Sequence, residues 1–189
     1  MAWHLRKPLL AAADSAGRIH IYDFAGKIPA LGQPPTGSGP PPPLAPSQLV
    51  HHEFQRGVAA LAWRPNSGAI LAAACLRGVC LWHLGSRGPL GGASGRAEGA
   101  GPSSVGSYRV GNSGGSNGSS SGSGGAWMTW LRPPAGAGPL TCLAWHPRGH
   151  LLAAASQQGA GFFVWDVATG ACTPVRVRGL AVNQGCGRL

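Results

Sequence analysis

Acidic side chains are scarce in this chain. Five Asp and Glu residues stand against 15 Lys and Arg residues, which gives the 189 residues a formal net charge of +10. A basic balance of this kind can indicate a protein that binds nucleic acid or acidic surfaces. The basic residues are nevertheless scattered singly, and Arg6-Lys7 is the one adjacent pair. Because a nucleic-acid footprint normally clusters, we interpret the charge as a solvated basic surface.

Long apolar runs and paired cysteines are also missing. No apolar run approaches the roughly 20 residues that span a bilayer, so any membrane association would go through a partner. The five cysteines form no C-x-x-C pair, and the N-terminus does not resemble a signal peptide, which favours a reducing, intracellular compartment. Cys75 and Cys80 lie in apolar runs, where we expect buried thiols that pack as small hydrophobes.

A pattern of three short apolar runs occurs three times, over residues 2–24, 58–84 and 140–167. In each copy a Trp closes the first run, a Leu-Ala-Ala-Ala segment forms the second, and an aromatic residue lies near the end of the third. The two aromatic residues of a copy are 19, 19 and 20 residues apart. The repeated positions are Trp3 with Tyr22 and Asp23, Trp63 with Trp82, and Trp145 with Trp165 and Asp166.

The apolar runs are predicted to be strands. Each run is short and bounded by Gly, Pro, Asn or Ser, and side chains in the third run alternate with period two. Apolar residues on both faces indicate sheets packed between neighbours. The Ala-rich second run is too short for a stable helix, and its small side chains suit a strand between tightly packed sheets. The sequence therefore predicts an all-β fold.

Two segments of different composition separate the copies. Residues 29–46 hold eight prolines, and 23 of the 35 residues in 91–125 are Gly or Ser. We expect a semi-rigid linker in the first and a flexible coil in the second. A further strand fits after each segment, at "LVHHEF" (49–54) and "WMTWL" (127–131). The insertions would then lie in the loop between a third and a fourth strand, where extra length is tolerated.

Strand triplets that end in Tyr-Asp, Trp-His and Trp-Asp resemble WD40 repeats, which build the blades of β-propellers. The usual Gly-His dipeptide ahead of the first strand is absent, and Ala16-Gly17 and Gln158-Gly159 replace the usual Asp-Gly turn. These departures remove residues of the hydrogen-bond tetrad found in many WD40 blades. Packing must therefore contribute more to the fold.

A closer resemblance is to the aladin family of WD40 nucleoporins. It rests on "FQRGVAALAWRPNSGAILAAAC", "GVCLWHL" and "PLTCLAWHPRGHLLAAASQQGAGFFVWDVATGACTPV", and it covers residues 2–24, 49–84 and 127–183. The resemblance implies a non-enzymatic propeller scaffold at the nuclear envelope side of the nuclear pore complex, supporting nucleocytoplasmic transport. It also implies that the partners are other nucleoporins, including a transmembrane nucleoporin that recruits the protein.

The expected domain organisation has six parts. Residues 1–28 form a partial first blade, 29–48 a Pro-rich linker, 49–84 a second blade, 85–126 a disordered Gly/Ser-rich insertion, 127–183 a third blade and 184–189 a truncated tail. Propellers close with roughly four to eight blades, and about three are present here. We therefore expect this sequence to be a fragment of a longer protein.

Catalytic, metal and nucleotide sites are not predicted. Asp23 and Asp166 occupy equivalent strand ends, which is a structural role, so no enzyme activity is expected. His51-His52 is the best candidate metal pair, but adjacent strand residues point to opposite faces and zinc-ligand spacing is absent. The glycines of 91–125 lack the Lys of a phosphate-binding loop. We expect no metal, no cofactor and no small-molecule substrate.

Three residues are candidates for binding a partner. The Trp residues of the second and third copies recur at matched positions, which indicates core packing, whereas Trp127 and Trp130 are predicted to be an exposed pair on the added strand. Exposed aromatic side chains more often contact a protein than a nucleic acid. Arg56, just ahead of an inner strand, is the third candidate. The four prolines of residues 40–43 are interpreted as linker.

Two other functions remain open at this point. A WD40 adaptor of another assembly, such as the substrate receptor of a ubiquitin ligase, would have the same fold and composition. Partner identity or location would separate the two. A basic nucleic-acid-binding module is the second alternative, and its affinity would fall steeply as salt rises.

Overall fold

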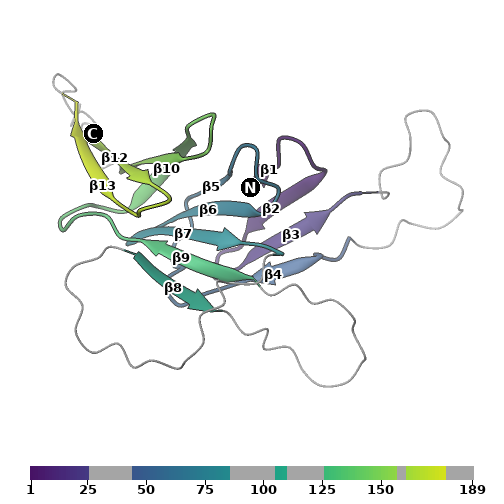
Figure 1. The fold of residues 1–189 in the computed structure, drawn as a ribbon. Coiled ribbons are helices and arrows are strands. Elements are labelled where there is room, and N and C mark those ends of the chain that lie inside the picture. Colours follow the sequence, from purple (N-terminus) through teal and green to yellow (C-terminus); the bar gives the residue numbers. More distant parts are fainter. Residues whose placement is uncertain (26–43, 86–104, 110–125, 157–160, 178–189) are drawn as a thin grey trace, which may run out of the picture.

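The computed structural model describes residues 1–25, 44–85, 105–109, 126–156 and 161–177. Every regular element in this part of the chain is a β-strand, and it contains no helix long and apolar enough to cross a membrane. The strands form three antiparallel sheets that follow one another along the chain (Figure 1). The predicted all-β fold is confirmed. Residues 40–43, most of the Gly/Ser-rich insertion and the tail at 184–189 lie outside the described residues.

In all three sheets three consecutive strands are followed by a fourth, outer strand, and the second sheet has a fifth strand at its edge. The first sheet contains β1 (Ala2–Trp3), β2 (Leu9–Ala13), β3 (Ile19–Asp23) and β4 (Gln48–Val50). The second contains β5 (Ala60–Trp63), β6 (Ile70–Cys75), β7 (Gly78–His83), β9 (Trp127–Leu131) and β8 (Val105–Arg109), in that spatial order. The third contains β10 (Leu140–Trp145), β11 (Leu151–Ser156), β12 (Gly161–Asp166) and β13 (Cys172–Arg176).

The strand register explains the constant spacing of the aromatic residues. In the second sheet Trp63 pairs with Leu71, and Leu71 pairs with Trp82. The same row across the first three strands occurs in the first sheet with Trp3, Leu10 and Tyr22, and in the third with Trp145, Leu152 and Trp165. Directly paired residues place their side chains on one face of the sheet. Each copy therefore contributes the same aromatic-Leu-aromatic row.

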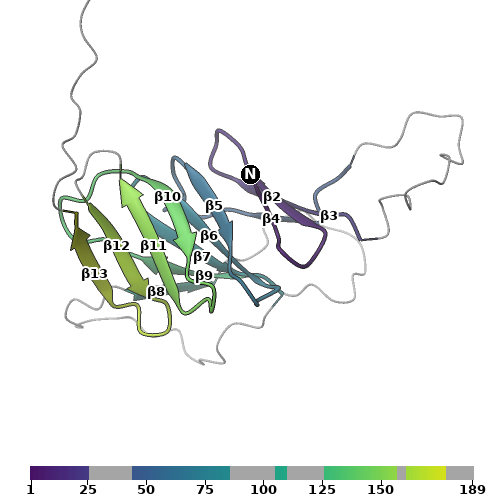
Figure 2. The same ribbon diagram turned by 90° about the horizontal axis from the view of Figure 1, so that it is seen from above.

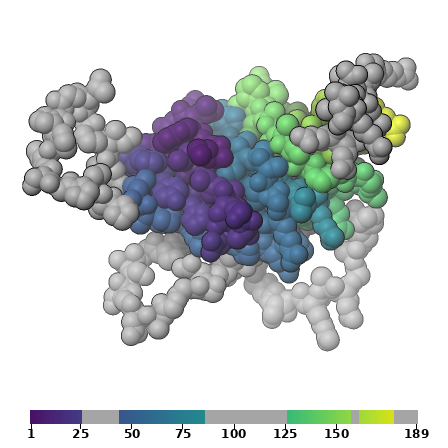
Figure 3. Space-filling view, turned by 180° about the vertical axis from the view of Figure 1, so that it is seen from behind, coloured from purple at the N-terminus to yellow at the C-terminus, as the bar shows by residue number. Residues whose placement is uncertain are grey.

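The middle sheet is buried on both faces. Residues 71–75 of β6 are all fully buried. Alternate residues of this strand belong to two core clusters, one shared with the first sheet and one with the third. Three of the five are alanines, and small side chains allow the neighbouring sheets to approach closely. The expectation of a sheet packed between two neighbours is confirmed for the middle sheet. Figure 3 shows the three sheets as one continuous body.

One hydrogen bond recurs at both boundaries between sheets. The Trp63 indole Nε1 donates to the carbonyl of Ala2 at 3.1 Å, and the Trp145 Nε1 donates to the carbonyl of Ala62 at 3.1 Å. Each Trp thus joins the first strand of its own sheet to the first strand of the preceding one. Trp3 holds the equivalent position in the first sheet, where its side chain is 58% exposed. No preceding sheet covers it among the described residues.

The fourth strands agree with the sequence in position but not in length. β4 pairs with β3 and β9 pairs with β7, so each insertion lies between a third and a fourth strand, as predicted. β4 ends at Val50, however, and residues 51–54 form a loop in place of the strand expected there. Because β4 and β9 each complete the preceding sheet, the sheets do not coincide with the segments 49–84 and 127–183. β8, inside the Gly/Ser-rich insertion, and β13 were not predicted.

The Trp-to-carbonyl bonds should stabilise the stacking of the sheets. We expect Trp63→Phe and Trp145→Phe each to lower the free energy of unfolding by about 1–3 kcal/mol, because each loses a hydrogen bond and part of a ring that packs at a sheet boundary. Trp3→Phe is the matched control, since the same change at an exposed side chain should alter stability by no more than about 0.5 kcal/mol. Urea denaturation of the three variants measures this, and three equal losses would contradict it.

Candidate functional site

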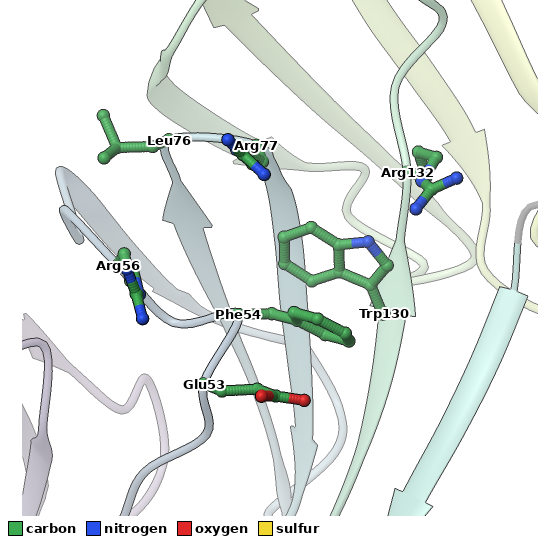
Figure 4. Close-up of a pocket in the computed structure, with 7 residues that line it drawn as sticks. All are labelled: Glu53, Phe54, Arg56, Leu76, Arg77, Trp130 and Arg132. Atoms are coloured by element: carbon green, nitrogen blue, oxygen red, sulfur yellow. The ribbon is translucent and has the colours of Figure 1, made fainter.

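A pocket of about 470 Å³ lies where three segments of the chain meet. The segments are the loop between β4 and β5, the turn between β6 and β7, and the end of β9 (Figure 4). We call it the arginine pocket, and its lining residues are Glu53, Phe54, Arg56, Leu76, Arg77, Trp130 and Arg132. The pocket thus combines three guanidinium groups, one carboxylate and three apolar side chains.

Backbone geometry brings the first two segments together. The amide of Leu76 donates to the carbonyl of Arg56 at 3.0 Å, which ties the β6–β7 turn to the loop before β5. Gly57 follows with φ +60°, in the left-handed region that favours glycine. A Cβ at Gly57 would collide with the Leu76 side chain, so the loop passes close to the turn because residue 57 is glycine. Arg56 and Arg77 are therefore held at one rim.

Trp130 forms the floor of the arginine pocket. It pairs with Cys80 across β7 and β9, and only 7% of its surface is exposed. Its ring packs over Gly78, where a Cβ would collide with the indole. The Phe54 ring packs against it with centroids 5.3 Å apart, tilted by 42°. Figure 4 shows Trp130 near the centre of the lining residues, with the arginine side chains around it.

A buried glutamine fixes the loop that carries Phe54 and Arg56. Gln55 is fully buried, and its Oε1 accepts a hydrogen bond from Trp82 Nε1 at 2.6 Å. Its Nε2 donates to the carbonyl of Gly17 in the β2–β3 turn, and also to that of Val50 at 3.4 Å. Gln55 therefore links the first sheet to the centre of the second. Removing one member of such a buried group lowers stability, because its former partners are left in the interior without hydrogen bonds.

The third copy lacks this arrangement. Ala137 lies at the same spacing before Trp145 as Gln55 does before Trp63. The Nε1 of the buried Trp165, which matches Trp82, has no hydrogen-bond partner among the described residues. The glutamine link thus belongs to the boundary beside the arginine pocket.

The electrostatics of the arginine pocket favour anions. Arg56, Arg77 and Arg132 are exposed, and none of them forms an ion pair within the described part of the chain. Glu53 is the single acidic lining residue. Unpaired guanidinium groups retain their planar set of donors for carboxylate or phosphate oxygens. The lining side chains therefore offer charged and apolar binding chemistry.

The structure brings together two of the three candidate partner-binding residues. Arg56 and Trp130 line the same pocket, whereas Trp127 does not. Trp127 stacks on His83, with ring centroids 3.6 Å apart and an angle of 6° between the planes. The prediction that Trp127 and Trp130 are an exposed pair is wrong, since Trp130 is buried and Trp127 is half-buried. Phe54, in the loop after β4, covers Trp130, and His83, on β7, covers Trp127.

The repeated aspartates hold turns. Asp23 Oδ1 accepts from the amide of Ala25 at 2.9 Å. Asp166 Oδ1 accepts from the amides of Thr169 and Ala168 at 3.1 and 2.9 Å, and these two bonds lower the pKa of the Asp166 carboxyl. Backbone amides stabilise the charged carboxylate, which caps the turn after the strand. These contacts agree with a structural role at both strand ends.

The two cysteines in the middle sheet are buried thiols, as predicted. Cys75 and Cys80 are fully buried, with their sulfur atoms 3.9 Å apart. The hydrogen bond with Cys75, followed by burial, raises the pKa of Cys80 well above its ordinary value. Among the residues that the structure describes, no group of three or more His, Cys, Asp or Glu side chains is placed to hold a metal ion.

Five lining residues of the pocket were not singled out from the sequence. They are Glu53, Phe54, Leu76, Arg77 and Arg132. A signal for the two arginines was present: if β9 pairs antiparallel with β7, Leu131 lies opposite Val79, so the residue after one strand approaches the turn before the other. The strand 127–131 was predicted, but its register was not.

Comparisons with known proteins agree with the resemblance seen in the sequence. The chain is 31% identical to Aladin from Arabidopsis thaliana over 182 residues, which is 95% of this chain and 34% of that protein. The chain is therefore aladin-like over nearly its whole length, and it spans about a third of the length of that relative. No family model matches. Hsv2 from Kluyveromyces lactis aligns over 93% of this chain and 50% of its own, with 12% identity and a TM-score of 0.32, too low to support an argument.

Removal of the buried glutamine should destabilise the fold. We expect Gln55→Leu to lower the free energy of unfolding by about 2–3 kcal/mol, because the Trp82 Nε1 and two carbonyls lose their partner in the interior. In a Trp82→Phe background the loss of unfolding free energy caused by Gln55→Leu should be smaller by about 1 kcal/mol or more, since the Trp82 Nε1 donor is no longer there to be left without a partner. Chemical denaturation of the double-mutant cycle tests this, and strictly additive effects would argue against the bond.

His83 should resist protonation in the folded protein. Burial, followed by the nearby positive charge of Arg64, lowers the pKa of His83 from 6.5 to about 4. The unfolded chain binds a proton at a higher pH than the folded chain, so stability should fall as the pH drops from about 6.5 towards 4. An NMR titration of the His83 ring should have its midpoint near this low value. In His83→Gln the loss of stability between pH 7 and 5 should be smaller, and an unchanged loss would contradict the assignment.

Proposed function

We propose, from the aladin-like sequence of this chain, that it is part of a WD40-type β-propeller that serves as a non-enzymatic scaffold of the nuclear pore complex. The observation that supports it best is the 31% identity to Aladin over 95% of the chain. In this role the protein presents rigid surfaces to partner proteins and supports nucleocytoplasmic transport. Its partners are other nucleoporins, among them a transmembrane nucleoporin, so its contact with the membrane is indirect.

The packing of the sheets supports the propeller. Neighbouring sheets contact each other mainly through their inner strands, with β5 against β1 and β2, and β10 against β5 and β6. The fourth strands lie away from these contacts, so the sheets fan outward from their first strands (Figure 2). Four-stranded antiparallel sheets packed side by side are the blades of propellers, and the middle sheet adds β8 to this pattern. The recurring Trp-to-carbonyl bond joins each first strand to the next.

The chemistry of the surface supports binding without turnover. The arginine pocket gathers charged and apolar side chains, and its lining contains no Ser, Thr, Cys or His. Asp23 and Asp166 hold turns through backbone amides. Arg56 and Trp130 are proposed to contact a partner through the pocket, and Trp127 through the adjoining strand surface. A scaffold needs rigid, complementary surfaces, and the stacked sheets supply the rigidity.

Location in the cell tests this proposal. The endogenous protein, tagged at its genomic locus, should give a punctate nuclear rim that coincides with a marker of the nuclear envelope. An unfused tag expressed at the same level is the control. A diffuse signal would favour an adaptor of another assembly, and a chromatin-bound signal that disperses at raised salt would favour nucleic-acid binding. Either result would reject the pore assignment.

A further inference from the structure

We propose that the arginine pocket binds a linear acidic segment of a partner protein, with one apolar side chain of that segment seated beside Leu76 and Phe54. The inference rests on the proposed scaffold function and adds to it the chemical class of the partner and the place where it binds. The arginine pocket is the site, and an acidic peptide is its occupant.

Charge gives the first reason. Arg56, Arg77 and Arg132 come from three different segments, and within the described residues none is neutralised by an ion pair. Three guanidinium groups therefore line one pocket, and each can bind a carboxylate through two parallel hydrogen bonds. Glu53 is the one opposing charge, and Figure 4 shows it beyond Phe54, away from Arg77 and Arg132. The side of the pocket that carries Arg77 and Arg132 is therefore the end that binds the acidic residues of a ligand.

The apolar lining gives the second reason, and it favours a peptide over an isolated phosphate. Leu76 is 48% exposed, so its side chain is open to a ligand at the edge of the pocket. The half-buried Phe54 and the edge of Trp130 continue the same surface. A phosphate group would leave this surface in water, whereas an apolar side chain between acidic residues would cover it. A mixed acidic and apolar segment satisfies both parts of the lining.

These 189 residues contain no segment that matches the proposed occupant. The chain has only five acidic residues, at positions 14, 23, 53, 98 and 166, and no two are close in sequence. It therefore contains no acidic segment that could fold back into the pocket. A net charge of +10 also accelerates the approach of an acidic partner over longer distances.

The site is organised before binding. The loop that carries Phe54 and Arg56 is held by the buried Gln55 and by the bond between the Leu76 amide and the Arg56 carbonyl. Trp130 is fixed by its pairing in β9 and by its packing over Gly78. Little backbone has to be ordered when a ligand binds, which leaves more of the interaction free energy for affinity.

Fluorescence anisotropy tests the proposal directly. The probe is a synthetic fluorescein-labelled peptide in which Asp and Glu residues flank one central Leu, titrated with the full 189-residue chain at about 0.15 M salt. The double substitution Arg77→Ala and Arg132→Ala should weaken binding by about tenfold. The peptide with its Leu replaced by Gly should also bind more weakly. Both arginines are exposed, so the variant should fold, and its circular dichroism and melting curve confirm this.

Matched controls separate a site from general attraction. Arg148→Ala with Arg176→Ala removes the same charge from exposed positions on the third sheet and should change affinity by less than about twofold. Equal weakening in the two double variants would overturn the proposal, and so would no binding by the native chain. Inositol phosphates and vesicles containing an anionic phospholipid are tested in parallel. If these bind through Arg77 and Arg132 and the peptide does not, the pocket is a phosphate site and the peptide proposal fails.

The outcome is independent of the pore assignment. A protein found at the nuclear rim that does not bind the peptide keeps its scaffold role and loses the proposed pocket ligand. A protein that binds the peptide through Arg77 and Arg132 but is absent from the rim keeps the pocket chemistry and loses the pore assignment.

Discussion

Close contact between neighbouring sheets at their inner strands is the constraint on which the rest of this structure depends. The middle sheet has no solvent-facing side along β6, where residues 71–75 are fully buried. Alanines in the second strand of every sheet have small side chains, which allow neighbouring sheets to pack closely. At both boundaries a Trp on the first strand adds a directional bond to the preceding sheet. Burial of apolar surface drives the sheets together. The indole hydrogen bonds fix the position of each first strand relative to the first strand of the preceding sheet.

Gln55 connects this stacking to the candidate site. Its amide joins the Gly17 carbonyl of the first sheet to Trp82 of the second, and its neighbours Phe54 and Arg56 line the arginine pocket. The loop cannot shift without breaking buried hydrogen bonds, so the stability of the sheet boundary and the geometry of the pocket depend on one residue. The third sheet, with Ala137 at the matching position, shows that the stacking itself tolerates the loss of this link.

Several basic residues have identifiable local roles in this structure. Arg18 pairs with Asp14, and Arg64 donates to the Gly149 carbonyl across the second sheet boundary, so some basic residues serve the fold. Arg56, Arg77 and Arg132 have no such partners in the described part of the chain and surround an apolar floor. A concave site with mixed character is typical of selective binding, because charge orients a ligand and apolar contact retains it. This arrangement is consistent with a scaffold that binds proteins.

The sequence alone determined the three copies, the first three strands of each copy and the recurring aromatic positions, because alternation, turn residues and repeat spacing are local properties. It also located the fourth strands at β4 and β9, but not the end of β4 at Val50, since the turn that follows depends on packing against Trp130. The tertiary structure decided which residues share a site. Arg56, Arg77 and Arg132 are far apart along the chain, and strand register together with one left-handed glycine brings them to one pocket. Such proximity has no local signature, so sequence patterns named Arg56 and Trp130 but missed the residues beside them.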